Sequence, residues 1–430
     1  MRSDSVTLRK RVAIVTNNVN CERHVQYYSN IEKYFIINGW EVAEDFNVDK
    51  VIICCCGFHD VMHEKVIKTV KELKDRHFLE NNIIIMGCQS KTHEAELMEK
   101  LKVKIIGFNR EKHLDDIINA RVPFGEITPN NLLRPFKECN LDERNEYFHI
   151  KIAQGCLTRC TFCVINKAKG YIKSTPDDEI LKQFRKAIKQ GKRRIYLMGE
   201  DTLAYGKDTG SNIIELVESM LAIDSQVELN FGSLHIKWLL EYKEGILSLC
   251  KRGIVKELHV GLQHVNDRLL KRMGRPIVFS ELYRFIKHLK KECPDVFLEA
   301  DILVGFPGET EEMFAQLVEF FEKDTCFNNV RHFAYSDVKG APSYKFDGKL
   351  STSQLVRRWE IFDKTLQKCS SNYKSEDASM MDVAFQLTHE RNYTFCKDTF
   401  KDEIENVVDD PGLMRAKSKI RLTENDDFTF

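Results

Sequence analysis

The sequence predicts an α/β protein: an N-terminal open parallel sheet, then a partial (β/α)6 barrel and a small C-terminal appendage. Short apolar runs alternate with helical patterns through the first 120 residues, and the alternation restarts at about residue 149. Alternating strand and helix patterns are typical of βαβ units, which build parallel sheets. A loop with three closely spaced cysteines directly follows the first strand of the second half. It indicates where the chemistry lies, because such barrels place their sites at the carboxyl ends of strands.

The bulk composition is that of a globular protein with a substantial core. The chain has 430 residues, 43% of them hydrophobic, with 65 basic and 65 acidic side chains. No apolar run approaches the roughly 20 residues of a membrane span, and the N-terminus lacks the apolar stretch of a secretion signal. We therefore expect a cytoplasmic protein without a membrane partner. A net charge of zero gives no global argument for a nucleic-acid partner. The locally basic residues 167–194 favour a solvated helix face, with contact to an anionic substrate as the alternative.

Four segments follow from these patterns. We expect an N-terminal domain over residues 1–120, a proline-rich linker over 121–147, a partial barrel over 148–350, and a helix with a small degenerate appendage over 351–430. The expected strands of the first domain are 11–17, 50–55, 82–87 and 104–108. The expected barrel strands are 149–155, 193–200, 227–234, 257–264, 297–306 and 329–336. Six such units are too few for the eight-stranded barrel.

Three cysteines in the loop after the first barrel strand form the strongest motif. Cys156, Cys160 and Cys163 are spaced C-x3-C-x2-C, in a chain with fourteen cysteines. A structural zinc site usually has four ligands in pairs, and no second pair lies nearby. A 4Fe–4S cluster is held by closely spaced thiolates, and three ligands leave one iron open. The spacing therefore favours a cluster over zinc.

A second set of cysteines falls at the expected strand ends of the first domain. Cys21 lies beyond the first strand, Cys56 ends the second and Cys88 follows the third. Carboxyl ends of parallel strands share one edge of the sheet, where ligands bind. These three thiols are candidates for a second cluster. We expect the other eight to be ordinary thiols: Cys54, Cys55, Cys139, Cys250, Cys293, Cys326, Cys369 and Cys396.

The cysteine loop resembles that of radical S-adenosylmethionine (radical SAM) enzymes, which have an aromatic residue, here Phe162, before the last cysteine. The resemblance implies that the open iron binds S-adenosylmethionine and that an electron from the cluster cleaves it to a radical. Gly199 and Glu200 resemble the family motif that holds the cofactor's amino group. Gly305, in "DILVGFPGET", resembles the glycine-containing segment behind the cofactor.

Residues 11 to about 345 resemble one family within that superfamily, the methylthiotransferases. The shared segments are "GWEV" after Cys21, Cys-Gly-Phe at 56–58, Gly-Cys at 87–88, "GCLTRCTFCVINKAKGYIKS", "GEDTLAYGKD", "LVGFPGETEEMF" and "FAYSDVKGAPS". The resemblance implies two 4Fe–4S clusters, one on each cysteine set, and S-adenosylmethionine as cofactor. The implied reaction inserts a methylthio group at an unactivated C–H bond. No general base is expected, because the cofactor supplies the radical.

The chain departs from the family pattern in ways that concern the substrate. Asn166 stands where the family usually has Pro, Lys169 where it has Arg, and Ser29 where it has an acid. Gln263, which we expect to contact the cofactor, begins Gln-His-Val instead of Gln-Ser-Gly. The C-terminal TRAM domain is divergent or missing. We therefore favour a peptide or protein side chain over a transfer RNA adenosine as substrate, with a donor such as flavodoxin or ferredoxin supplying electrons.

Two other classes of function remain open at this stage. One is a radical SAM enzyme that uses its second cluster for electron transfer or sulfur donation without methylthio transfer. The other is a non-catalytic iron–sulfur protein. His264 is a candidate pocket residue, although a packed strand histidine is commoner, and Arg357 and Arg358 are expected on a helix surface.

Overall fold

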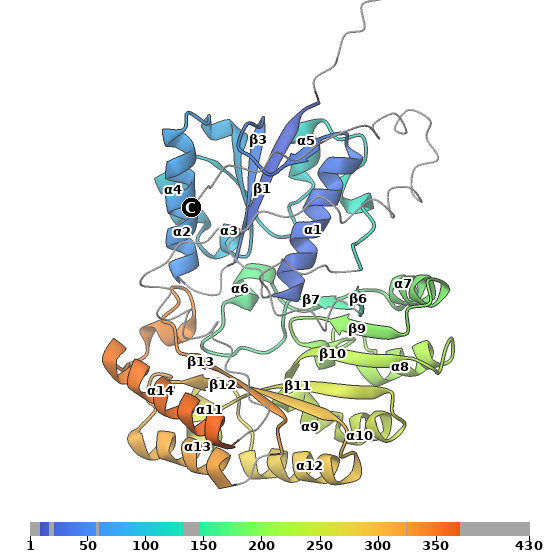
Figure 1. Cartoon of the computed structure of the whole chain (residues 1–430), viewed down its shortest axis with the longest axis vertical. Coiled ribbons are helices and arrows are strands. Elements are labelled where there is room, and N and C mark those ends of the chain that lie inside the picture. Colours follow the sequence, from blue (N-terminus) through green and yellow to red (C-terminus); the bar gives the residue numbers. More distant parts are fainter. Residues whose placement is uncertain (1–8, 17–20, 57–59, 132–146, 324–325, 370–430) are drawn as a thin grey trace, which may run out of the picture.

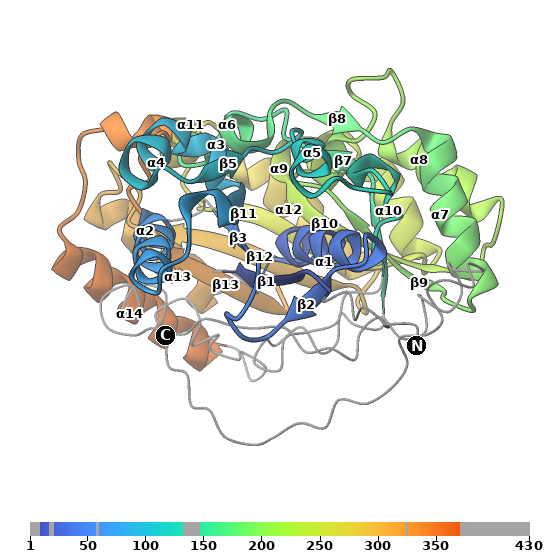
Figure 2. The same cartoon turned by 90° about the horizontal axis from the view of Figure 1, so that it is seen from above.

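The computed structural model describes residues 9–16, 21–56, 60–131, 147–323 and 326–369. Two parallel sheets with their helices lie one above the other (Figure 1). Seen from above, the N-terminal sheet covers the strands of the larger sheet (Figure 2). The predicted α/β class, with a parallel N-terminal sheet and a partial barrel, is confirmed. Cys139 and Cys396, both expected to be ordinary thiols, and the C-terminal appendage beyond residue 369 lie outside the described residues.

The N-terminal sheet has five parallel strands in the order β2-β1-β3-β4-β5. Its strands are β1 (Arg11–Thr16), β2 (Glu41–Ala43), β3 (Lys50–Cys55), β4 (Ile83–Gly87) and β5 (Lys104–Ile106). Its helices are α1 (Glu22–Ile37), α2 (Asp60–Asp75), α3 (Gln89–Thr92), α4 (Glu94–Leu101) and α5 (His113–Ile118). This strand order reverses direction between β1 and β3, and ligands of such sheets bind in the crevice at that point.

Alternating side chains of this sheet enter two separate cores. Ile14 and Cys54 face helix α1, whereas Val15 and Cys55 face helix α2. Both thiols are fully buried, and the Cys55 thiol donates to the Met86 carbonyl at 2.9 Å. Of the three consecutive cysteines, Cys56 is thus left at the carboxyl edge of the sheet, beyond the last residue of β3.

The larger sheet has six parallel strands in sequential order, from β6 at one edge to β13 at the other. Its strands are β6 (Phe148–Lys151), β9 (Arg194–Met198), β10 (Glu228–His235), β11 (Val255–Gln263), β12 (Phe297–Val304) and β13 (Asn329–Ala334). Its helices are α7 (Asp177–Lys189), α8 (Ile213–Leu221), α9 (Ile236–Glu241), α10 (Lys243–Lys251), α11 (Asp267–Arg272), α12 (Phe279–Glu292) and α13 (Glu311–Lys323). Among the described residues, no helix combines the length and apolar character that crossing a membrane requires.

One expected strand divides into two elements. The predicted strand 149–155 ends as β6 at Lys151, and β7 (Ala153–Gln154) instead pairs antiparallel with β8 (Lys173–Ser174). This small hairpin encloses the cysteine loop and the short helix α6 (Ile165–Lys169). The loop is therefore closed at its base by backbone pairing.

The last described helix, α14 (Thr352–Cys369), packs on α13 and β13. Ser351 caps this helix: its hydroxyl accepts from the Gln354 amide, and the Gln354 side chain accepts from the Ser351 amide at 2.9 Å. Arg358 corrects our expectation of a surface residue. It is buried and forms ion pairs with Glu309 at 2.6 Å and Glu311 at 2.7 Å, while Arg357 is exposed.

The two sheets share a continuous apolar interior. Tyr196 and Met198 of β9 belong to the same core cluster as Ile14 and Tyr28 of the N-terminal domain. Ser29, the residue that replaces the family's acid, accepts a hydrogen bond from the Asn130 side chain at 2.7 Å. The substitution therefore ties helix α1 to the segment that leads into the barrel.

Glu32 gives the N-terminal core a dependence on pH. Its side chain is buried in helix α1, and burial raises its pKa from 4.5 to about 8. Between these values the folded chain holds a proton that the unfolded chain releases, so stability falls as pH rises, by up to about 1.4 kcal/mol per pH unit. We expect Glu32→Gln to raise the melting temperature at pH 7.5 and to change it little at pH 5. Glu72→Gln on exposed α2 is the control, and equal gains at both pH values would contradict this account.

Candidate active site between the two sheets

The cysteine loop brings three thiols together beside the barrel strands. The Thr158 hydroxyl lies 3.0 Å from the Cys156 sulfur and 3.9 Å from the Cys160 sulfur. The Ile165 amide donates to the Cys163 sulfur at 3.5 Å. Cys160 and Cys156 act electrostatically on Cys163, so the three thiols are neighbours in one loop, although among the described residues they are not placed as a ready group of metal ligands.

The protonation of these thiols fits a site for a cationic metal centre. Burial, together with Asp201, raises the pKa of Cys156 to about 11, and burial with the neighbouring Cys160 raises that of Cys163 to about 12. At neutral pH the metal-free loop therefore holds thiols. Irons carry the positive charge that turns thiols into thiolate ligands, so loading would release protons.

Hydrogen bonds from the far side of the barrel hold the loop in place. The Thr161 amide donates to the Met273 carbonyl and its hydroxyl to the Arg272 carbonyl, both at 2.9 Å. The Ser343 amide donates to the Thr161 carbonyl at 2.8 Å. Gly274, with φ +77°, leaves no room for a Cβ, which would lie 2.6 Å from the Arg159 carbonyl oxygen. The loop therefore has one well-defined conformation against the strand ends.

The residues expected to contact S-adenosylmethionine lie around this loop in different settings. Phe162 packs at an angle against Phe306, with ring centroids 6.4 Å apart. Gln263 has φ +72° at an irregularity of β11, and backbone strain in a non-glycine residue is typical of functional positions. Gly305 has a separate packing reason to be glycine, because a Cβ there would meet the Leu355 side chain at 2.1 Å.

Glu200 has three protein partners for its carboxylate. One oxygen accepts from the Gly155 amide at 2.8 Å, and the other lies 2.6 Å from the Lys169 ammonium and 3.7 Å from the Arg23 guanidinium. Burial raises the pKa of this carboxyl, but Lys169 and Arg23 outweigh burial and the net pKa is lowered. Glu200 is therefore an ionised residue that joins the cysteine loop to helix α1.

Sequence analysis missed two polar residues inside the barrel. Burial raises the pKa of Asp201 from 3.8 to about 7, and this side chain accepts from the His235 amide at 3.3 Å. Arg275 is buried, donates to the Gly261 carbonyl, and lies over the Phe162 ring at 5.6 Å. Asp201 directly follows Glu200, which was the one available signal, whereas nothing near Arg275 in the sequence points to the site.

His264 lies one residue beyond β11 and is a packed histidine. It is fully buried, its ring lies 3.3 Å from the Glu309 carboxylate, and its other nitrogen accepts from the Asn266 amide at 3.0 Å. Since Glu309 also pairs with Arg358, these residues hold helix α14 against the end of β12.

The three N-terminal cysteines follow three neighbouring strands at one sheet edge. In the register of the sheet, Cys55 pairs with Gly87, so Cys56 and Cys88 are adjacent beyond that pair. The Cys88 amide also donates to the Cys55 carbonyl at 2.8 Å. Cys21 precedes helix α1 at the end of the crossover from β1, the strand on the other side of β3. The three thiols therefore follow neighbouring strands along one edge, although among the described residues they are not placed as a ready group of metal ligands.

This edge faces the cysteine loop of the barrel. Helix α3, which follows Cys88, packs against α6, which follows Cys163, and the two lie one above the other in Figure 1. Burial lowers the pKa of Lys169, but Glu200 and then Cys88 and Cys21 outweigh it and raise the pKa. Burial also lowers the pKa of Arg23, but Cys21 and Glu200 outweigh burial, and the net pKa is raised. Two cations therefore lie between the two sets of cysteines.

The fold and the cysteine loop define a radical SAM enzyme. The sequence model of the radical SAM superfamily matches residues 150–321. A radical S-adenosylmethionine methyltransferase from Kitasatospora setae, TsrM, superposes with a TM-score of 0.52 over 75% of this chain and 72% of its own. At 14% identity this likeness shows the fold alone.

Sequence relatives indicate which family within the radical SAM superfamily this chain resembles. The ribosomal protein uS12 methylthiotransferase RimO of Desulfotalea psychrophila is 29% identical over 78% of this chain and 79% of its own. The threonylcarbamoyladenosine tRNA methylthiotransferase MtaB of Thermotoga maritima is 27% identical over 78% and 77%. A probable threonylcarbamoyladenosine tRNA methylthiotransferase of Pyrococcus horikoshii is 29% identical over 73% and 74%. These matches support the methylthiotransferase family of the radical SAM superfamily, whose members use S-adenosylmethionine and two 4Fe–4S clusters.

Gly155 tests the need for a fixed cysteine loop. It has φ +80°, and a Cβ would lie 2.4 Å from the Tyr171 carbonyl oxygen, so Gly155→Ala must displace the backbone that carries Cys156. We expect this variant to lose most of the iron of the barrel site, measured after reconstitution in a chain that lacks the N-terminal cysteines. Gly191→Ala is the control, because Gly191 has φ +71° and no atom within 4 Å of its Cβ position. Equal iron in both variants would show that the loop tolerates displacement.

Proposed function

We propose that this protein inserts a methylthio group into a macromolecular substrate, with its two sets of cysteines as the two cluster sites. Cys156, Cys160 and Cys163 hold the cluster that binds S-adenosylmethionine, and Cys21, Cys56 and Cys88 hold the second. The observation that carries the proposal is the position of Lys169 and Arg23, which contact Glu200 beside the barrel loop and influence Cys21 and Cys88 as well. A sulfur source and a radical source placed face to face are what methylthio transfer needs.

The residues of the chain hold and enclose the reactants. When bound, the clusters and S-adenosylmethionine supply the one-electron chemistry and the sulfur. Phe162, Gly199, Gln263 and Gly305 line the cofactor position at the carboxyl ends of the strands, and Glu200 keeps the cysteine loop in register with helix α1. The joined apolar cores of the two domains exclude water from the region between them. No side chain is needed as a general base.

The domain boundaries and the setting are part of the proposal. Residues 1–120 form the domain of the second cluster, 121–147 the linker, 148–350 the barrel and 351–430 the C-terminal extension. A flavodoxin- or ferredoxin-like protein donates the electrons. The cytoplasm is the compartment that suits this chemistry, because it keeps thiols reduced.

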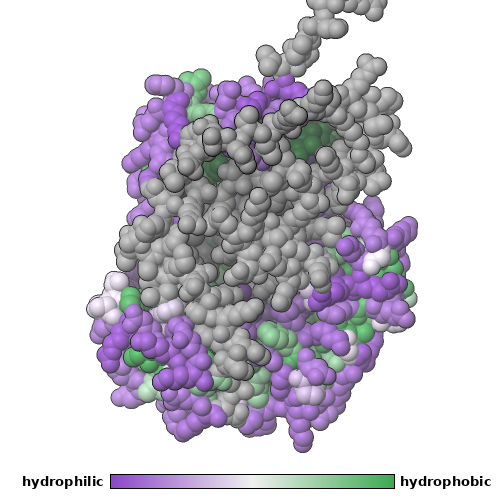
Figure 3. Space-filling view, viewed as in Figure 1, coloured by the Kyte–Doolittle hydropathy of each residue, from purple (hydrophilic) through white to green (hydrophobic). Residues whose placement is uncertain are grey.

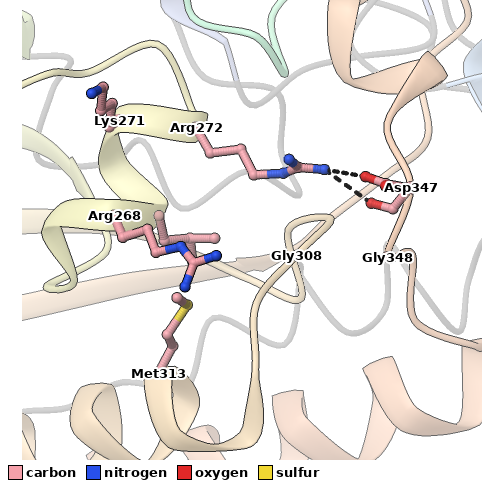
Figure 4. A pocket seen from close by; sticks show the side chains of 8 residues that line it. Arg268, Lys271, Arg272, Gly308, Met313, Asp347 and Gly348 are labelled. Atoms are coloured by element: carbon pink, nitrogen blue, oxygen red, sulfur yellow. Dashed lines mark hydrogen bonds and ion pairs between the residues drawn. The ribbon is translucent and has the colours of Figure 1, made fainter.

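A basic pocket beside the cysteine loop supports RNA as the substrate. The pocket has a volume of about 420 Å³ and is lined by Arg268, Leu269, Lys271, Arg272, Gly308, Met313, Asp347 and Gly348. Figure 4 shows Arg272 reaching to Asp347 and Arg268 directed toward Met313. Within the described part of the chain, Arg268 and Lys271 form no ion pair, so both charges are available to phosphates.

A polypeptide is the second candidate for the substrate. The relative from Desulfotalea psychrophila is named for a ribosomal protein. Where Figure 3 draws described residues, its visible face is largely hydrophilic. The basic pocket places RNA first, and both substrates are assayed.

Iron content tests the two cluster sites. Reconstituted wild type should hold about eight irons per chain, and each triple variant, Cys21/Cys56/Cys88→Ala or Cys156/Cys160/Cys163→Ala, about four. Cys54→Ala and Cys250→Ala are the controls, since both thiols are buried in apolar cores. A wild type with about four irons, unchanged in the N-terminal triple variant, would exclude the second site.

The pocket predicts a specific salt dependence. Arg268→Gln should weaken transfer RNA binding and reduce the slope of log affinity against log salt by about 1, as expected for one lost phosphate contact. Lys323→Gln on the exposed face of α13 should change neither quantity. Unchanged RNA binding in the Arg268 variant, with methylthio transfer to a peptide instead, would favour the polypeptide reading.

A further inference from the structure

Arg23 links the two halves of the candidate site through contacts that no sequence motif indicated. It lies two residues after Cys21, in the first turn of helix α1. Its guanidinium donates to the Gly199 carbonyl at 3.0 Å and to the Ser233 hydroxyl at 3.4 Å. The turn of chain that carries Cys21 is therefore attached to the carboxyl ends of β9 and β10, where the barrel site begins.

The buried contact between Arg23, Lys169 and Glu200 carries more positive than negative charge. Arg23 and Lys169 both pair with the single carboxylate of Glu200, and the side chains of Lys169 and Glu200 are only 8% and 4% exposed. A buried surplus of positive charge is costly unless an anionic group lies beside it. Cys21 lies in the same turn of chain as Arg23, and a cluster held by thiolates is net anionic.

The barrel cysteines have a different electrostatic setting. Asp201 contributes to the raised pKa of Cys156, and Arg275 opposes the raised pKa of Cys163. Arg23, in contrast, lies two residues after Cys21 in the first turn of α1, and it shares the Glu200 carboxylate with Lys169. Fixed cations are therefore placed beside the N-terminal site.

We propose that Arg23 is a positioning residue that anchors the N-terminal three-cysteine site on the barrel and raises the reduction potential of the cluster held there. Reduction adds negative charge to the cluster, and a nearby fixed cation stabilises the reduced form. Lys169 acts in the same direction from the barrel side. This inference rests on the proposed second cluster, and it adds the protein groups that tune that cluster.

The test isolates the N-terminal cluster in the Cys156/Cys160/Cys163→Ala background. The midpoint potential is measured by a redox titration followed by electron paramagnetic resonance. Arg23→Gln should shift it to a more negative value, and Lys169→Gln should shift it in the same direction. Arg23→Lys keeps the charge and should restore most of the original potential. Lys68→Gln removes a half-exposed cation of helix α2 and should leave the potential unchanged.

The outcomes separate this inference from the proposed function. Equal potentials in the Arg23→Gln, Lys169→Gln and Lys68→Gln variants would overturn it, and so would equal shifts in Arg23→Gln and Arg23→Lys. If Arg23→Gln fails to retain iron, the Lys169→Gln result decides. A background protein that binds no iron although all three N-terminal cysteines are present would instead overturn the proposed second cluster.

Discussion

The ion pair between Lys169 and Glu200 is the contact on which the arrangement of the site depends. The 2.6 Å pair joins the end of helix α6 to the end of β9, and the Lys169 ammonium also lies over the Phe108 ring of the N-terminal domain at 4.9 Å. Because the pair is buried, loss of Glu200 would leave Lys169 and Arg23 without their shared anionic partner and cost about 3–5 kcal/mol. This interaction therefore links the cysteine loop to the N-terminal domain.

Parallel sheets explain how the chain brings two distant sets of cysteines together. Each sheet gathers the residues after its strands at one edge, so sequence positions 21, 56 and 88 become neighbours in space. The barrel places the loop at 156–163 at its own carboxyl edge. The shared core of Ile14, Tyr28, Tyr196 and Met198 then holds one domain over the other. Apolar packing holds the two domains together, and the buried ion pairs fix their relative position.

The periodicity of the sequence predicted the architecture well because parallel strands are continuous apolar runs between amphipathic helices. All six barrel strands and four of the five N-terminal strands were expected. Strand β2 was missed because it has three residues, of which only Ala43 is buried. The predicted strand 149–155 was too long, because the turn to β7 depends on pairing with β8, which local pattern does not reveal.

The site was predicted only in part, because sequence patterns report local spacing and do not reveal contacts between distant positions. The cysteines are visible in sequence because their spacing is local. The partners of Glu200 are not, since Arg23 lies 177 positions away and is an ordinary basic residue of an amphipathic helix. Arg358 was expected on a surface for the same reason: its burial depends on Glu309 and Glu311, which follow a different strand.

The central claim is that two cluster sites face each other across the Lys169–Glu200 ion pair. The most direct measurement is the electron paramagnetic resonance spectrum of the fully reduced, reconstituted wild type, compared with the sum of spectra from the two cysteine triple variants. Neighbouring paramagnetic clusters interact, so the account predicts a wild-type spectrum that is broadened or split relative to that sum. A wild-type spectrum equal to the sum would show that the two sites are far apart, and would contradict the account.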